Sequence, residues 1–190
     1  MISLCVIEIV CFAIKTLYNS YFKQRNMLIF AFTCKCMKIL EMQQLNLPTY
    51  KAKIIKNGSE LKIFDVLRQK YVALTPEEWV RQNFIHFLVN YKGYNPTLMA
   101  NEVGICLNGV KKRCDSVLYT KGLVPRMIIE YKRPDVEITQ KVFDQICRYN
   151  MVLRVDYLIV SNGISHYCCK MDYERQQYVF LEDIPDYKDL

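Results

Sequence analysis

The segment RMIIEYKRP, residues 126–134, constrains the fold more than any other part of the sequence. Its apolar residues follow one another without alternating with polar ones, which is typical of a strand covered on both faces. The same segment carries a carboxylate, Glu130, and an amine, Lys132, two positions apart. Residues i and i+2 of a strand point to the same face. We therefore predict a central strand with an acidic and a basic group side by side, or, as the alternative, a solvated strand end with a surface ion pair.

Turn and capping signals divide the preceding part of the chain into strands and one helix. Asn57-Gly58 favours a hairpin between two short strands. The segment TPEEWVRQNFIHFLVNYKG predicts a helix that is capped by Thr75, has Pro76 in its first position and ends at Gly93. The residues expected to form its buried face are Trp79, Val80, Phe84, Phe87, Leu88 and Tyr91.

Strands are also predicted at about 99–107, 110–119 and 125–132. A second helix follows, capped by Thr139, and then a buried strand in DYLIVSNG and two outer strands. The inward residues of this helix are expected to be Val142, Phe143, Ile146, Tyr149 and Leu153. This order predicts an α/β fold with one mixed central sheet flanked by helices.

Charge and cysteine content limit the functional classes. The net charge of +7 over 190 residues permits a nucleic-acid partner without requiring one. Nine cysteines, an odd number, form no CxxC pair or Cys/His cluster with zinc-finger spacing. These features favour a reduced, cytoplasmic protein over a secreted disulfide framework.

The first forty residues differ in composition from the rest. MISLCVIEIVCFAIK is apolar but too short to span a membrane, and it is interrupted by Glu8. We expect residues 1–41 to be an N-terminal extension outside the native domain, which would comprise residues 42–190. If translation starts at Met37 or Met42, this segment is upstream sequence and is likewise outside the domain. A membrane-skimming anchor is the alternative, and we do not expect a membrane partner.

A second carboxylate is predicted to lie near Glu130. Asp115 belongs to the preceding strand, and pairing of the two strands about Lys121-Gly122 can bring the two carboxylates together. Carboxylate oxygens without histidine or thiolate suit a hard cation such as Mg²⁺ or Mn²⁺.

The residues around these carboxylates resemble a known family. RCDSVLY followed by IIEYK resembles the D-x(n)-E-x-K core of the PD-(D/E)xK nuclease superfamily. The wider pattern resembles the N-terminal nuclease domain of type I restriction enzyme R subunits, in a short stand-alone form. TPEEWVRQ, KKRCDSVLY, QICRY and LIVSNG occur in the family's order and spacing, from about Leu45 onward. One departure is Cys114, where the family usually has a small residue such as alanine.

The resemblance implies a restriction-endonuclease-like core and assigns roles to five residues. Asp115 and Glu130 would hold Mg²⁺ or Mn²⁺, and Lys132 would orient or activate water. Gln145, a fourth catalytic candidate, and Tyr149 form the Q-x-x-x-Y pair that the family places beside the active site. The two share one helical face because they are four residues apart.

Two further carboxylates and a group of basic residues are candidates for the site. Glu78 and Glu102 are candidate accessory metal ligands, although a capping box with Thr75 would also account for Glu78. A basic cluster near Asp115 either tracks nucleic-acid phosphates or is a solvated face. The basic candidates are Lys111, Lys112, Arg113 and Arg133.

The sequence as a whole predicts a metal-dependent nuclease that acts on nucleic acid, with DNA as the expected substrate. It has no G-x-x-x-x-G-K-[ST] segment and therefore no P-loop ATPase motor. A protein partner would then supply motor or specificity functions. The alternative is a module or accessory subunit of the same fold that binds nucleic acid without cutting it.

Overall fold

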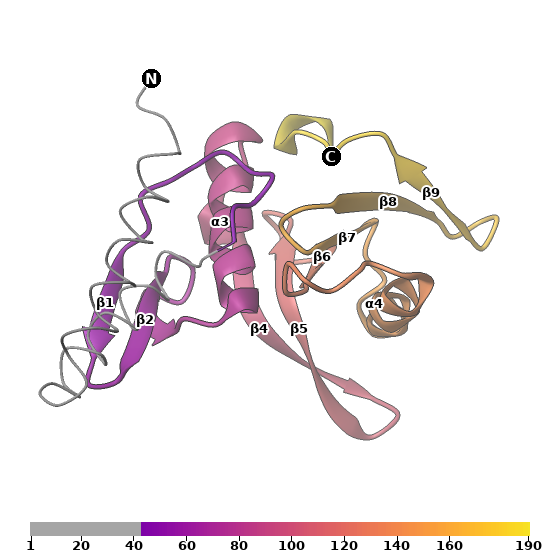
Figure 1. Cartoon of the computed structure of the whole chain (residues 1–190). Coiled ribbons are helices and arrows are strands. Elements are labelled where there is room, and N and C mark those ends of the chain that lie inside the picture. The colour runs from indigo at the N-terminus through magenta and orange to yellow at the C-terminus, as the bar shows by residue number, and fades with distance from the viewer. Residues whose placement is uncertain (1–42) are drawn as a thin grey trace, which may run out of the picture. The chain divides into compact units, whose positions relative to one another are not determined.

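The computed structural model describes residues 43–190, and the predictions for residues 1–41 lie outside this range (Figure 1). The helices and strands of the described part are β1 (Ile54–Asn57), β2 (Glu60–Asp65), β3 (Lys70–Ala73), α3 (Pro76–Tyr91), the 3-10 helix η1 (Pro96–Leu98), β4 (Met99–Leu107), β5 (Val110–Tyr119), β6 (Pro125–Tyr131), α4 (Gln140–Leu153), β7 (Tyr157–Ser161), β8 (His166–Asp172), β9 (Gln177–Leu181) and the 3-10 helix η2 (Tyr187–Asp189).

A six-stranded sheet in the order β4-β5-β6-β7-β8-β9 forms the centre of the fold. The pair β6–β7 is parallel, and the other pairs are antiparallel, so the sheet is mixed. A second sheet has the order β1-β2-β3. The hairpin predicted at Asn57-Gly58 is confirmed, because Asn57 pairs with Glu60. The strand β3 was not predicted, since its four residues show no regular alternation.

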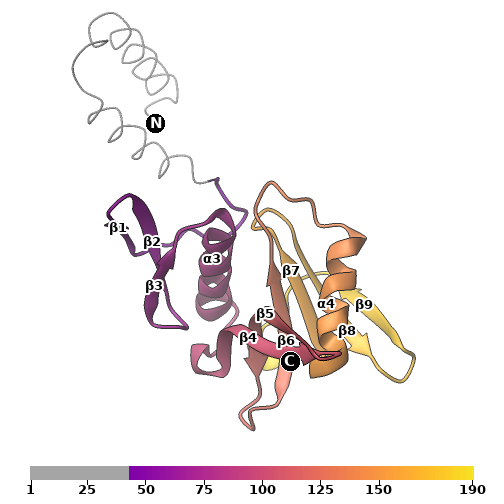
Figure 2. The same cartoon turned by 90° about the horizontal axis from the view of Figure 1, so that it is seen from below.

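The two helices cover opposite faces of the six-stranded sheet (Figure 2). In β6, Met127 and Ile129 pack with α3, whereas Ile128 packs with α4. All three side chains are 0% exposed. The predicted central strand, covered on both faces, is thus confirmed, and so is the mixed sheet flanked by helices. The strand ends at Tyr131, and Lys132 therefore follows it instead of belonging to it.

The start of α3 agrees with the sequence prediction, but its buried face differs. The Thr75 side chain accepts a hydrogen bond from the Glu78 backbone N–H at 3.0 Å, and Pro76 is the first helical residue. Tyr91, which we expected to be buried, is 56% exposed. The buried face of α3 also includes polar residues that pair with one another and with the sheet. A periodicity of apolar residues does not reveal the burial of ion-paired groups, and the polar residues of this face were therefore not predicted.

The helix α4 also follows the prediction closely. Its N-cap is Thr139, although the Thr139 side chain makes no capping hydrogen bond. Phe143 and Ile146 are buried as expected, whereas Tyr149 and Leu153 are only partly buried. The Tyr149 hydroxyl accepts a hydrogen bond from Gln145 Nε2 and so belongs to the polar site described below.

Candidate active site

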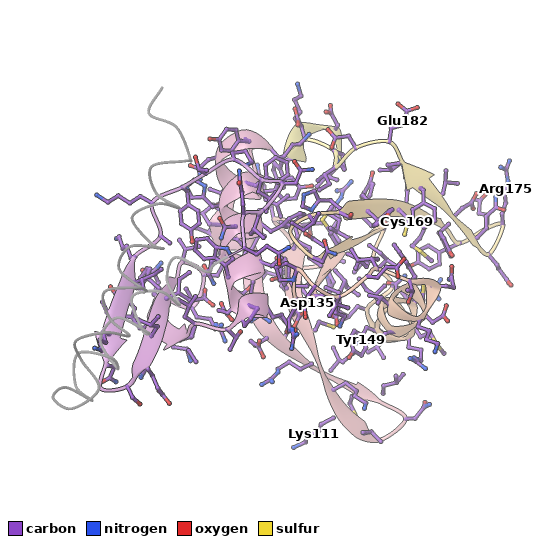
Figure 3. The ribbon with its side chains drawn as sticks, in the orientation of Figure 1. Lys111, Asp135, Tyr149, Cys169, Arg175 and Glu182 are labelled. Atoms are coloured by element: carbon purple, nitrogen blue, oxygen red, sulfur yellow. The ribbon has the colours of Figure 1, made fainter. Side chains whose placement is uncertain are left out.

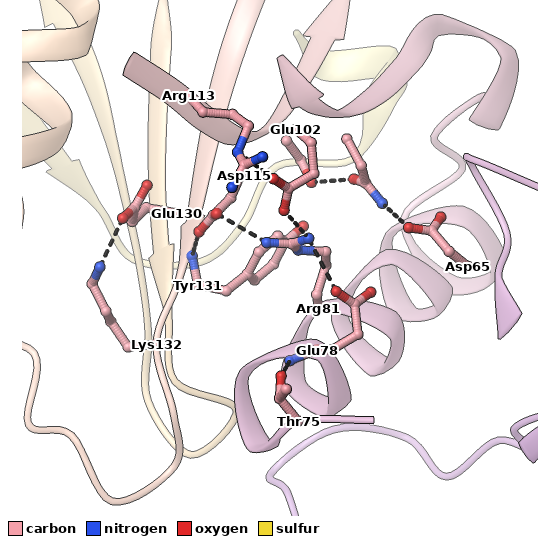
Figure 4. A network of polar contacts seen from close by, with 12 residues as sticks. Asp65, Thr75, Glu78, Arg81, Glu102, Arg113, Asp115, Glu130, Tyr131 and Lys132 are labelled. Atoms are coloured by element: carbon pink, nitrogen blue, oxygen red, sulfur yellow. Dashed lines mark hydrogen bonds and ion pairs between the residues drawn. The ribbon is translucent and has the colours of Figure 1, made fainter. Parts of the chain in front are cut away.

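The site lies where β5 separates from β6. The ladder between these strands ends at the pair Ser116–Ile129, while β6 continues beside β7 as far as the pair Tyr131–Ser161. The Tyr131 backbone N–H donates instead to Asp115 Oδ2 at 2.8 Å (Figure 4). Asp115 is therefore fixed at the point where the two strands diverge, next to the end of a central strand.

The carboxylate of Glu130 is buried, and its two oxygen atoms have different surroundings. Lys132 Nζ donates to Oε1 at 2.7 Å, and Gln145 Nε2 donates to the same atom at 2.8 Å. Gln145 Nε2 also donates to the Tyr149 hydroxyl at 3.2 Å. The other oxygen, Oε2, is buried and has no hydrogen-bond partner among residues 43–190. Such an atom is costly unless a ligand or ion completes its coordination.

Burial and repulsion from neighbouring carboxylates shift the pKa values of both carboxylic acids upward. Burial raises the pKa of Glu130 to about 7, and the negative charge of Asp115 contributes in the same direction. Burial also raises the pKa of Asp115, against the opposing effect of Arg81. Burial lowers the pKa of Lys132, but its hydrogen bond to Glu130 and the nearby carboxylate charges raise it by more. The two carboxylates therefore have less positive charge nearby than their ionised forms require.

These donors fit a hard divalent cation. Asp115 and Glu130 offer carboxylate oxygens, and one of these oxygens has no partner. In the described part of the chain, no group of three or more His, Cys, Asp or Glu side chains is arranged to hold a metal ion. Two carboxylates completed by water and by a phosphate oxygen are a common ligand set for Mg²⁺, whereas structural zinc needs four protein ligands.

The two accessory carboxylates predicted from the sequence have partners other than a metal. Glu78 accepts hydrogen bonds from Gln82 Nε2 at 2.7 Å and from Arg81 Nη1 at 3.1 Å. Its backbone N–H is capped by Thr75, so the cap is confirmed, while its carboxylate turns toward Arg81 instead of completing a capping box. Glu102 likewise pairs with Arg81 and with Arg113.

A carboxylate that the sequence interpretation missed, Glu77, is electrostatically coupled to the site. Burial raises the pKa of Glu77, Asp115 raises it further, and Lys132 lowers it. Its charge also contributes to the raised pKa of Glu130. Successive residues of a helix differ by about 100° in direction, so Glu77 and Glu78 point to different neighbours. The only signal available in the sequence was the i, i+4 spacing of Glu77 and Arg81.

The four basic candidates differ in their exposure and in their ion-pair partners. Lys111 and Lys112 are exposed on the hairpin formed by β4 and β5, where Figure 3 labels Lys111. Arg113 is 69% exposed and pairs with Glu102 near the site. Arg133 directly follows Lys132 and pairs with Asp135. Lys111 and Lys112 are therefore accessible to a polyanion, whereas Arg113 and Arg133 each already pair with a carboxylate.

The fold and the site define a mixed α/β protein in which two carboxylates, a lysine and a glutamine gather where β5 separates from β6. Residues 76–185 match the family described as type I restriction enzyme R protein N terminus. Because this match covers more than half of the chain, the protein belongs to that family.

One solved structure similar to this chain is a fragment described as an HsdR subunit of a type I restriction enzyme from Vibrio vulnificus YJ016. The sequence identity is 19% and the TM-score is 0.43. The similarity covers 59% of this chain and 24% of the other, so this chain spans about a quarter of that fragment. No curated protein matches the chain. Among residues 43–190, no helix is both long and apolar enough to cross a membrane.

Proposed function

We propose that this protein is a metal-dependent nuclease that hydrolyses phosphodiester bonds of DNA. The observation that carries the proposal is the buried, unpartnered Oε2 atom of Glu130 beside the Asp115 carboxylate. A second oxygen of the same carboxylate already binds Lys132 and Gln145. This combination provides a cation site and a positively charged group at one point.

Each residue has a distinct role in the proposed reaction. Asp115 and Glu130 would hold Mg²⁺ or Mn²⁺, which supplies Lewis acidity toward the phosphate and toward a bound water. Lys132, an ammonium at neutral pH whose pKa is raised further, orients the attacking water and stabilises negative charge on the phosphate oxygens. Gln145 holds the Glu130 carboxylate in place, and Tyr149 in turn contacts the Gln145 amide.

Basic side chains outside the cation site would bind the nucleic-acid backbone. Lys111 and Lys112 are exposed on the β4–β5 hairpin, and Arg113 and Arg133 lie nearer to the carboxylates. Contacts of this kind fix the position of the backbone without reading the base sequence. Membership of the R-protein family further supports the proposal that a partner protein supplies motor or specificity functions.

A nuclease assay with isosteric variants tests this proposal. Plasmid, linear duplex, single-stranded DNA and RNA are incubated with the full chain and Mg²⁺ or Mn²⁺. We expect Asp115→Asn, Glu130→Gln and Lys132→Met each to reduce cleavage at least about 100-fold, because each removes a charged group at the reacting phosphate. Glu182→Gln, which makes the same chemical change at an exposed position, is the matched control.

The assay also separates the alternatives. Cleavage that persists in all three site variants would refute the proposed active site. Metal-independent binding without cleavage, unaffected by the variants, would instead identify a nucleic-acid-binding module. If the wild-type chain neither binds nor cuts, the proposal of an autonomous nuclease fails, and affinity capture of a motor partner from the host becomes the next experiment.

A further inference from the structure

Arg81 occupies a buried position between α3 and the six-stranded sheet, and its side chain is 4% exposed. Nη2 donates to Asp115 Oδ1 at 2.9 Å. Nη1 donates to Glu102 Oε1 at 2.6 Å and to Glu78 Oε2 at 3.1 Å. One planar guanidinium thus binds carboxylates from α3, β4 and β5 (Figure 4).

This arrangement determines the orientation of Asp115. Arg81 holds Oδ1, and the Tyr131 backbone N–H holds Oδ2, so the plane of the carboxylate is fixed from two sides. Each carboxylate oxygen has two lone pairs, and one hydrogen bond therefore leaves a lone pair on each atom for a cation. A carboxylate fixed in this way can bind a metal ion without first losing side-chain freedom.

Stability of the helix–sheet contact does not require such a cluster. A buried ion pair is frequently no more stabilising than apolar side chains of similar volume, because the charged groups lose their hydration. Apolar residues already join α3 to the sheet, among them Val80, Phe84 and Leu88. Stability of the helix–sheet contact alone therefore does not account for a buried arginine at this point.

The backbone of Glu102 supports this view. Its φ angle is 60°, in the left-handed region that residues other than glycine rarely adopt within a strand. The β4–β5 ladder pairs Asn101 with Ser116 and Val103 with Cys114, and it skips Glu102 between them. Glu102 lies at this irregularity, and its carboxylate binds Arg81. Strained residues of this kind concentrate at functional sites, where the surroundings hold them in place.

We propose that Arg81, held by Glu102, is a positioning residue for the Asp115 carboxylate and thereby sets the affinity of the site for a divalent metal ion. The inference rests on the proposed function, since it takes Asp115 as a metal ligand. Glu102, a candidate metal ligand in the sequence, acts in this scheme through Arg81.

Two variants of the full chain test whether Arg81 acts by orienting the Asp115 carboxylate. They distinguish this role from an effect of the Arg81 charge and from a loss of folding. Arg81→Lys keeps the positive charge but replaces the planar fork with a single ammonium, which cannot bind the same oxygens together. Glu102→Gly removes one of the three carboxylates that Arg81 binds and also relieves the left-handed backbone, so it need not destabilise the fold. Asn108→Gly is the matched control, because Asn108 also has a positive φ angle, 50°, in the turn between β4 and β5.

The measurement is the dissociation constant of Mn²⁺, determined by isothermal titration calorimetry without nucleic acid, with circular dichroism melts to verify folding. We expect Arg81→Lys and Glu102→Gly to weaken Mn²⁺ binding about 10- to 100-fold, as loss of groups that orient ligands generally does. Asn108→Gly should bind Mn²⁺ as the wild type does. If Arg81→Lys does not fold, Glu102→Gly decides the question.

The Mn²⁺ measurement distinguishes failure of the positioning role from failure of the metal site. Folded Arg81→Lys and Glu102→Gly proteins that bind Mn²⁺ with the wild-type affinity would overturn the positioning role alone. A wild-type protein that binds no Mn²⁺ would overturn the proposed metal site and, with it, this inference. An equal loss of affinity in Asn108→Gly would also contradict the inference, because that substitution leaves Arg81 and its partners intact.

Discussion

Replacing Glu130 by glutamine is expected to stabilise the metal-free protein at alkaline pH. In the wild type, residue Glu130 is 4% exposed, and burial raises the pKa of its carboxyl from 4.5 to about 7. An unfolded chain restores an ordinary pKa, so folding opposes ionisation of this group. Glutamine keeps an oxygen that can accept hydrogen bonds from Lys132 and Gln145 but carries no charge to bury.

The sign and size of the change in the free energy of unfolding follow from the pKa values of Glu130 in the folded and unfolded states. A group whose pKa is raised by folding contributes stability below its unfolded pKa and loses that contribution as the pH rises through its folded pKa. Each pKa unit corresponds to about 1.4 kcal/mol, so ionised Glu130 costs the folded wild type about 3 kcal/mol at pH 8. At pH 5 the same cost is less than about 1 kcal/mol, because Glu130 is still largely protonated in the folded protein.

Urea unfolding with a chelator and a thiol reductant measures this effect. The free energy of unfolding of Glu130→Gln and wild type is compared at pH 5 and pH 8, with Glu182→Gln as the exposed control. The expected gain is about 3 kcal/mol at pH 8 and much smaller at pH 5. A variant that is no more stable than the wild type at pH 8, or equally stabilised at both pH values, would refute the reasoning.

Three other variants have defined outcomes. Thr75→Ala removes the side-chain acceptor for the Glu78 N–H and should lower the free energy of unfolding by about 1 kcal/mol, measured by urea denaturation. Gly163→Ala should destabilise the fold by about 1–2 kcal/mol in the same assay, because φ is +83° and the new methyl group would meet Leu45. Lys111→Ala combined with Lys112→Ala should reduce the salt slope of DNA binding by about 2, measured by fluorescence anisotropy at several salt concentrations; an unchanged slope would exclude these lysines from phosphate contact.

Much of the fold was predictable because its signals are local. The Thr75 cap with Pro76 at the next position defines the start of α3, and Asn57-Gly58 defines a hairpin. The unbroken apolar run before Glu130 marked a central strand, and both faces of that strand are covered. Each of these features depends on residues that are close together in the chain.

The candidate site was predictable only in part. The sequence placed Asp115 on the neighbour of the strand that carries Glu130, and it placed Gln145 and Tyr149 on one helical face. The structure brings Gln145 to Glu130 at 2.8 Å and Tyr149 to Gln145 at 3.2 Å.

What the sequence alone determined about this protein is the order of its elements, the central strand and the set of carboxylates, lysine and glutamine available for a site. Only the tertiary structure decided which groups pair. Arg81 and Asp115 are far apart in the chain, but Arg81 Nη2 lies 2.9 Å from Asp115 Oδ1. The Glu77 carboxyl is electrostatically coupled to Asp115 and Lys132. The physical reason is that the partner and the pKa of a buried charge depend on neighbouring elements and on desolvation, and neither is encoded in local spacing.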